Sequence, residues 1–387
     1  MLVLLIGLLL ALPALASPRI GVVTMQPGEI FWERFGHDAI VVAAPDGQAI
    51  SYNFGYFDPT ESDFVSRFAR GEMRYQLVAL PLDVDLAQYR DQGRGVNVQW
   101  LDLSPAQAEK LAADLAENAR PENAHYHYDY FRDNCATRVR DALDRALDGA
   151  LGPQLAASSQ GNTYRSEAAR LASPAPWMWL AFQLGLGPNA DHPLSRWDEA
   201  FIPMRLADSL RNAKTANGTP LVIAEQQWLP HTLTPEPGER APPLLGFAIA
   251  GIAIALAWLL IGRRYPRLAA GFAFGFWLLC GLIGTAMLYL WLGTAHWAGW
   301  RNHALLLMNP LAWLLLPGAW AMLRGRLATR GFRIVLVIVS AIAALALVDV
   351  ALGIDRQQYG IWIALVLPIH LALGWRYARP HASGIKP

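Results

Sequence analysis

Residues 244–264 read LLGFAIAGIAIALAWLLIGRR, an uncharged run that ends at Gly262 and is followed by two arginines. A helix of this length crosses the hydrocarbon core of a bilayer, which is about 30 Å thick. In lipid the main chain must satisfy its own hydrogen bonds, and a helix does so. The stretch therefore predicts a transmembrane helix and places the second half of the chain in a membrane.

The rest of the second half repeats this pattern. Four more apolar stretches, long enough or nearly long enough to cross a bilayer, lie at 269–292, 304–323, 334–352 and 360–375. With the first, at 244–261, they predict an all-α domain of about five transmembrane helices within residues 243–387.

Basic residues distinguish the links between these stretches. The links after the first, third and fifth stretches are the basic ones, with Arg263, Arg264 and Arg267, then Arg324, Arg326, Arg330 and Arg333, then Arg376, Arg379 and Lys386. The links at 293–303 and 353–359 carry one arginine each. Because cytoplasmic loops collect Lys and Arg, this predicts a bacterial inner-membrane protein with a periplasmic N-terminal half and a cytoplasmic C-terminus.

Charge also divides the chain into two parts. From Leu244 onward 12 Lys and Arg stand against two Asp and Glu, a net charge of +10, and the preceding residues carry a net charge of −9. Such asymmetry indicates two environments. The basic residues lie between apolar runs rather than on a polar face, so nucleic acid is not the expected partner. Membrane lipid is.

The N-terminus has the features of an export signal. Residues 1–16 are almost entirely apolar and end in Ala14-Leu15-Ala16, an A-x-A-like cleavage site. They predict a secretory signal peptide. No Lys or Arg precedes the apolar run, so an uncleaved anchor or a misassigned start is the alternative.

Residues 17–150 show the mixed periodicity of an α+β domain. Strands are expected at 39–43, 50–54, 73–80 and 96–103, and helices at 104–118 and 135–147. The turn residues at 45–47 join the first two strands into a hairpin. Thr60 and Asp63 resemble a capping box for a further helix that ends at Gly71.

Residues 151–242 are expected to form an irregular extension and a Pro-rich linker. Gly, Pro and Ser are frequent to about residue 193, and Pro recurs from 230 to 243. A helix is predicted only at 203–213. Trp177, Trp179 and Phe182 form an aromatic cluster that is either core or a surface facing the membrane.

Cys135 is the only cysteine before the membrane domain, because the other, Cys280, lies inside the second apolar stretch. Asp133 or Asn134 can cap the helix that Cys135 opens. A thiol at a helix N-terminus feels the positive end of the helix dipole, which favours the nucleophilic thiolate. The alternative is a small residue of the core.

A thiol nucleophile needs a base, and His37 at the edge of an apolar strand is the best candidate. Asn53, on the next strand, can reach a histidine on the first and orient its imidazole. The other histidines of this half lie outside such a setting. Neither a metal-ligand cluster nor a phosphate-binding loop stands out, so no metal and no cofactor are expected.

Three motifs resemble those of a known family. FGH at 35–37, YNFG at 52–55 and DNCATRVRD at 133–141 are similar to the signature of the Lnb N-terminal periplasmic domain. A multi-span tail with His303 and the pair Asn309-Pro310 near its outer face is also similar to Lnb. The order of these motifs is similar to the circularly permuted papain-like fold of NlpC-type and lecithin retinol acyltransferase relatives.

The resemblance implies a reaction. Lnb is a lipoprotein intramolecular transacylase, which moves an acyl chain from the diacylglyceryl group of a bacterial lipoprotein to the α-amine of its N-terminal cysteine and leaves a lyso-form lipoprotein. Carried over, Cys135 is the nucleophile, His37 the base and Asn53 the orienting residue. Asp38 departs from the pattern, because a small or hydroxylated residue is expected after the histidine.

Further residues are implied in supporting roles. Asn134 and Arg138, in the third motif, are expected to support the nucleophile or the oxyanion. His303 and Asn302, in an outer link, are expected to touch the lipid headgroup, unless they only belong to an interfacial belt. Asp349, within the fourth stretch, is a candidate because acids are rare in membrane spans.

Two other functions compete with the acyltransferase. One is an NlpC-type peptidase or amidase of the cell envelope, for which a single tether would suffice in place of five spans. The other is a non-enzymatic membrane assembly protein, in which Cys135 would be dispensable.

Overall fold

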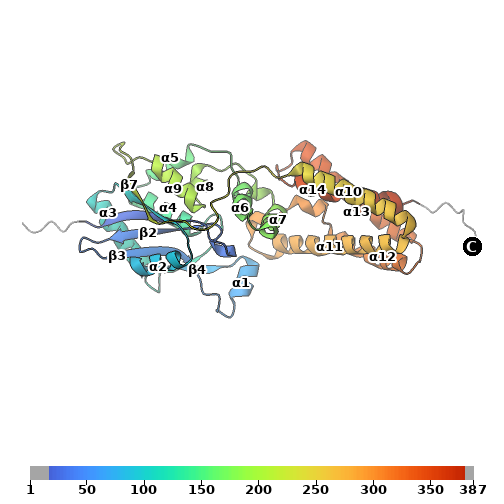
Figure 1. Ribbon diagram of the computed structural model, residues 1–387, viewed down its shortest axis with the longest axis horizontal. Helices are drawn as coiled ribbons and strands as arrows, with labels where there is room; N and C mark the ends of the chain where they lie inside the picture. The colour runs from blue at the N-terminus through green and yellow to red at the C-terminus, as the bar shows by residue number, and fades with distance from the viewer. Residues whose placement is uncertain (1–16, 380–387) are drawn as a thin grey trace, which may run out of the picture. The chain divides into compact units, whose positions relative to one another are not determined.

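The computed structural model describes residues 17–379, so the expected signal peptide at 1–16 lies outside the described residues. The chain forms two compact units. The first contains residues up to Thr60, residues 73–160 and residues 195–236; the second contains residues 61–72, 161–194 and the chain from Pro237 onward. Figure 1 shows the sheet of the first unit and the long helices of the second.

The first unit is built on a seven-stranded antiparallel sheet in the order β6-β4-β3-β2-β1-β5-β7. Its strands are β1 (Arg19–Met25), β2 (His37–Ala43), β3 (Ala49–Tyr56), β4 (Arg74–Pro81), β5 (Val96–Leu101), β6 (His125–His127) and β7 (Val222–Leu229). The central strands are buried on both faces, because alternate side chains enter two separate hydrophobic cores.

Helices cover both faces of this sheet (Figure 1). One core includes side chains from α3 (Pro105–Asn118), α4 (Cys135–Ala146), α5 (Leu151–Ala156) and α9 (Pro203–Asn212). The opposite core lies under α2 (Leu82–Asp91). Because α4 packs on the face that β2 and β3 present, its first residue comes close to the ends of those strands.

Several predictions made from local patterns are confirmed. The hairpin of β2 and β3, the strands at β4 and β5, and the Ser104 capping box of α3 are all present. The predicted capping box of Thr60 and Asp63 is wrong: Thr60 bonds Asp58 instead, and helix α1 (Phe64–Arg70) has no side-chain cap. That helix does end at Gly71, whose φ of 74° is the left-handed conformation that glycine adopts without strain.

The segment expected to be irregular is largely ordered. It contains α5, α6 (Tyr164–Ala172), α7 (Pro176–Gly185), η2 (Pro188–Ala190), α8 (Arg196–Glu199), α9 and β7. Strand β7 escaped prediction because it is an edge strand whose side chains are mostly exposed, which removes the alternation that marks a strand. Trp179 of the aromatic cluster packs against the core of the second unit, whereas Trp177 is exposed.

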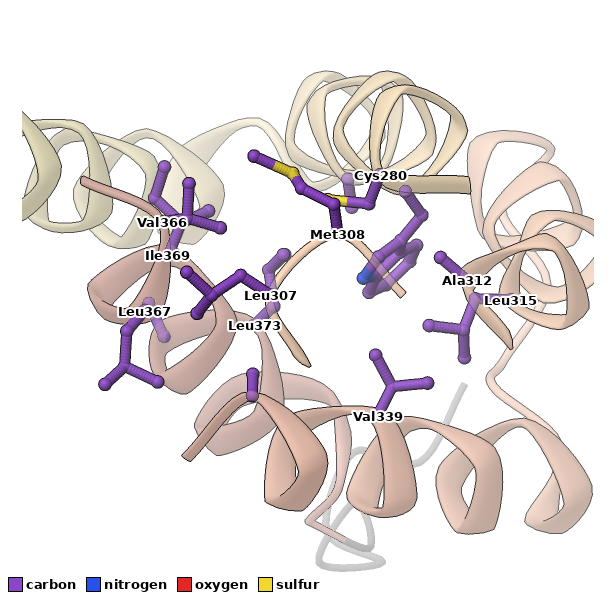
Figure 2. Packing of buried hydrophobic residues seen from close by; sticks show 14 of the residues in the cluster. Cys280, Leu307, Met308, Ala312, Leu315, Val339, Val366, Leu367, Ile369 and Leu373 are labelled. Carbon is purple, nitrogen blue, oxygen red and sulfur yellow. The ribbon is translucent and has the colours of Figure 1, made fainter. Parts of the chain in front are cut away.

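Within the described residues, the second unit contains five helical segments that are long and apolar enough to cross a membrane, which confirms the predicted number. They are α10 (Leu244–Arg264), α11 (Pro266–Gly293), the segment His303–Leu323, α13 (Arg330–Leu352) and α14 (Gly360–Tyr377). Figure 2 shows Cys280, Met308, Leu315 and Val339 directed into their common interior. Cys280 is therefore a packing residue, as predicted.

The third segment is not one continuous helix. It consists of η4 (His303–Leu306), η5 (Pro310–Leu315) and α12 (Leu316–Leu323). Pro310 has no N–H to donate, and the Asn309 side chain instead accepts a hydrogen bond from the Leu311 N–H at 2.9 Å. Gly284 of α11 faces this break, where any side chain would collide with the Met308 carbonyl oxygen.

Candidate active site

Cys135 is the first residue of α4, and Asn134 caps that helix. The Asn134 Oδ1 accepts from the Thr137 N–H at 3.0 Å, and the Thr137 Oγ1 accepts from the Asn134 N–H at 2.8 Å. The Asn134 amide also donates to the carbonyls of Tyr130 and Phe201. Every donor of Asn134 is thus engaged, so this residue holds the helix start in place and leaves no N–H for an oxyanion.

The Cys135 thiol lies against main-chain N–H groups. Those of Asp38, Ala136 and Cys135 itself lie near the sulfur and act to lower the pKa of the thiol. Burial nevertheless raises the pKa of Cys135 to about 12, and the negative charge of Asp38 adds to the rise. The N–H groups at the helix start favour the thiolate as expected, but the loss of hydration has the larger effect on the pKa of Cys135. With its pKa raised, Cys135 carries a neutral thiol at physiological pH.

His37 begins β2, and its imidazole meets Asn53 of β3. The His37 Nε2 lies 3.0 Å from the Asn53 Oδ1. The Asn53 amide nitrogen donates to the Asp85 Oδ2 and the Ser51 Oγ, each at 3.1 Å. Because a carboxylate only accepts, these bonds turn the amide oxygen toward His37. The imidazole then carries its hydrogen on Nε2 and leaves Nδ1 as a free base.

Burial also sets the charge of the imidazole. It lowers the pKa of His37 to about 4, with the Asp85 carboxylate opposing and the Arg94 guanidinium adding to the shift. His37 is therefore neutral at physiological pH. Asp38 directly follows His37, so the influence of its N–H on the Cys135 thiol indicates that the sulfur lies near the strand end that carries the imidazole.

Two buried charged residues support the site, and the sequence patterns did not indicate either of them. Asp85 of α2 is 3% exposed and holds the Asn53 amide. Arg94 is 4% exposed, donates to the Gln26 carbonyl and lies over the Tyr89 ring. In sequence Asp85 looks like an ordinary acid in the first turn of a helix, and no local signal separates it from Asp83.

Tyrosines form one wall of the site. Arg138 pairs with Asp133 and lies 4.0 Å from the Tyr126 ring centroid, so it fixes that ring and is occupied by an ion pair. The Tyr126 hydroxyl is buried without a hydrogen-bond partner among the described residues. A Cβ added to Gly55 would lie 3.6 Å from the Cys135 Cβ and 3.8 Å from this hydroxyl. Gly55 adopts a φ of 90° at a bulge of β3, which opens the space between them.

The carboxyl group of Asp38 is buried, and we predict that its burial lowers the stability of the folded protein in a pH-dependent way. Burial raises its pKa from 3.8 to about 7, although Thr24 donates to one of its oxygens. Between these pH values the unfolded chain loses the proton and the folded protein keeps it. The contribution of Asp38 to stability should therefore fall as pH rises from about 4 to 7, by on the order of 4 kcal/mol. The lowered pKa of His37 makes an opposing contribution that rises between about pH 4 and 6.5.

Asp38→Asn removes the falling contribution and leaves the rising contribution of His37, so its unfolding temperature should increase with pH over this range relative to the wild type. Unfolding of the detergent-solubilised protein at several pH values measures the slope. Asp46→Asn, in the exposed β2–β3 turn, is the control and should keep the wild-type slope. Equal slopes for the wild type and Asp38→Asn would contradict the assignment.

The membrane-side candidates belong to the second unit. Asn302 is 2% exposed and its amide donates to the Leu184 and Leu186 carbonyls, while its oxygen accepts from the Gln357 side chain. Its side chain thus joins chain segments together. The His303 Nδ1 lies 3.0 Å from an Asp349 oxygen that also accepts from the Tyr359 hydroxyl. His303 and Asp349 form a polar cluster at one end of the spans.

Among the described residues, five apolar helices and an antiparallel α+β unit with the His37–Asn53 contact define a multi-pass membrane protein that has an α+β domain outside the spans. Two family models match the chain: the Lnb N-terminal periplasmic domain over residues 14–169, and the Lnb transmembrane domain over residues 239–379. The chain belongs to the Lnb family, and its N-terminal domain is periplasmic. No curated protein and no solved structure matches it significantly.

Proposed function

We propose that this protein is a thiol acyltransferase that acts on bacterial lipoproteins from the inner membrane. In this reaction an acyl chain moves from the diacylglyceryl group to the N-terminal amine through a thioester on Cys135. The observation that carries the proposal is the Asp85–Asn53–His37 chain of hydrogen bonds, which leaves the His37 Nδ1 as a base at the strand end where the thiol lies. Membership of the Lnb family supports a lipoprotein substrate.

We further propose a permuted papain-like core. The imidazole comes from an early strand, its amide partner from the neighbouring strand, and the thiol from the start of a later helix that packs on both. Papain-like enzymes use the same three groups, a thiol, an imidazole and an amide, and the triad is recognised by geometry and not by order in sequence.

In the first half-reaction the His37 Nδ1 takes the thiol proton while the sulfur attacks the ester carbonyl carbon. The N–H groups around the sulfur stabilise the thiolate only as it forms, which suits a thiol that rests neutral. The tetrahedral intermediate collapses with cleavage of the C–O bond. The glycerol oxygen leaves with the proton from His37, and a thioester remains on Cys135.

In the second half-reaction the α-amine of the lipoprotein attacks the thioester carbonyl. The His37 Nδ1 takes a proton from the attacking nitrogen and returns it to the departing sulfur, which restores the thiol and releases an amide. Water competes for the same thioester. The tyrosines beside Cys135 restrict its access, and an amine is the stronger nucleophile, so transfer is favoured over hydrolysis.

Tyr126→Phe should slow acyl transfer by about 10²-fold, chiefly in kcat, because the unpartnered hydroxyl beside Cys135 is the group placed to donate to the oxyanion. The change removes one oxygen and keeps the ring under Arg138. Initial rates at several substrate concentrations separate kcat from KM.

Tyr130→Phe is the matched control. Its hydroxyl contacts the Met73 sulfur at 3.7 Å, and it should retain nearly full activity. Equal losses in the two variants would indicate a packing effect and remove the oxyanion role of Tyr126.

Expression in cells whose lipoproteins carry only the diacylglyceryl group tests the function. Mass spectrometry of lipoprotein N-termini should then show an N-acylated lyso-form, absent from cells without the protein. Unchanged lipoproteins, together with folded protein in the inner membrane, would overturn the assignment. Cleavage of cell-wall peptides by the purified protein would point to the peptidase instead.

A further inference from the structure

Three consecutive apolar residues are exposed on the first unit. Ile30 is 46%, Phe31 39% and Trp32 60% exposed, around the short turn η1 (Phe31–Glu33). Exposure of a contiguous apolar patch to water is unfavourable. Such patches therefore mark sites that contact another protein, a membrane or an apolar ligand.

A line of aromatic rings connects this patch with the candidate active site. The Trp32 and Phe57 ring centroids are 6.2 Å apart, those of Phe57 and Tyr75 4.9 Å, and those of Tyr75 and Tyr128 4.3 Å. Tyr128 lies 3.7 Å from the point where a Gly55 Cβ would stand, and that point is 3.6 Å from the Cys135 Cβ. We call Trp32, Phe57, Tyr75 and Tyr128 the aromatic track.

The aromatic track lies at the surface for most of its length. Phe57 and Tyr128 are partly exposed, as is Cys135 at its end, and Tyr75 is the buried member of the track. Rings that only filled a core would be covered, as Phe54 is at 2% exposure. The track is therefore a row of neighbouring rings that is open to solvent at Trp32, is partly exposed at Phe57 and Tyr128, and ends beside a thiol.

We propose that the aromatic track binds the acyl chain of the substrate, with the Ile30–Trp32 turn as its lipid-contacting entrance. The inference rests on the proposed acyl transfer. An ester carbonyl that reaches Cys135 leaves the bilayer, and its methylene groups then lose their apolar surroundings at a cost proportional to the area exposed. Aromatic faces along the path replace those surroundings. A short acyl group needs no such path, so the track selects long chains.

The test compares a short and a long ester on the full-length protein in detergent. The rate of Cys135 acylation is measured by intact mass with p-nitrophenyl acetate and with p-nitrophenyl palmitate as the two probes. Trp32→Ser should lower acylation by the palmitate ester about tenfold and change acylation by the acetate ester less than twofold. Trp32→Phe, which keeps an aromatic face, should restore most of the long-chain rate.

Ile223→Ser is the control, because this residue is 61% exposed on β7 of the same unit and lies outside the track. It should leave both rates unchanged. Equal losses with both esters in Trp32→Ser, or no loss with either, would overturn the acyl-chain site. Loss confined to intact lipoprotein would also overturn it and assign the patch to the polypeptide. An unmutated protein that neither ester acylates would instead overturn the proposed function.

Discussion

Cys135→Ala is expected to abolish acyl transfer, with a loss on the order of 10⁴-fold or more, because removal of the nucleophile from a nucleophile–base pair leaves only binding and oxyanion contributions. The fold should survive, since Cys135 is partly exposed and α4 is held by the Asn134 capping box, which the substitution does not touch. Mass spectrometry of lipoprotein N-termini measures the product. Circular dichroism of the purified variant checks that it is folded.

The chain offers its own control for this result. Cys280 is the other free thiol and is buried among the membrane helices, so Cys280→Ala should transfer acyl groups at the wild-type rate. Cys135→Ser adds a sharper readout, because any acyl group trapped on it would be an ester that resists neutral hydroxylamine, unlike the thioester. Full activity in Cys135→Ala would contradict the proposed mechanism and would favour the non-enzymatic assembly role.

Asp191→Ala is expected to destabilise the second unit by about 3–5 kcal/mol, because it leaves a buried guanidinium without its counter-charge. Arg165 and Asp191 have side chains 1% and 0% exposed, and the Arg165 Nε lies 2.7 Å from the carboxylate. Arg165 also donates to the Gln183 and Leu186 carbonyls, and the carboxylate accepts from the Gln358 N–H at 3.0 Å. One substitution therefore loosens α6, the end of α7 and the link before α14.

The unfolding temperature in detergent, followed by tryptophan fluorescence, measures this loss. Asp208→Ala is the matched control, because its pair with Arg211 is about half exposed on both sides and should contribute less than about 1 kcal/mol. Similar shifts for the two variants would contradict the argument from burial. Replacement of both Arg165 and Asp191 by apolar residues should recover part of the stability, since no unpaired charge remains.

Patterns among residues close together in sequence were sufficient to predict much of the secondary structure of this protein. The five spans follow from composition alone, because lipid demands long apolar helices wherever they pack. The capping boxes at Ser104 and Asn134 are decided by residues three apart. The His37–Asn53 contact was also within reach, because a tight turn at 45–47 sets the register that pairs Ala39 with Asn53 and brings the two side chains to one strand end.

Other features arose only from residues far apart in sequence. Strand β7 joins the sheet by pairing with β5, more than a hundred residues earlier, and its exposed side chains carry no strand pattern. Segments 61–72 and 161–194 belong to the unit that contains the spans, although they precede Pro237. Such pairings depend on shape and burial in the folded chain, which a local window does not contain.

The sequence by itself therefore determined the membrane topology expected for this chain, the helix that begins at Cys135, and the three residues proposed for catalysis. Only the tertiary structure decided the protonation and the contacts of these residues. The protein packed around Cys135, which stays partly exposed, removes hydration from the thiol, so the pKa of Cys135 rises where the helix terminus alone would lower it. The same packing brought Asp85 to Asn53 and Tyr126 to Cys135. Capping and span formation depend on neighbours along the chain, whereas desolvation and convergence depend on everything that packs around a group.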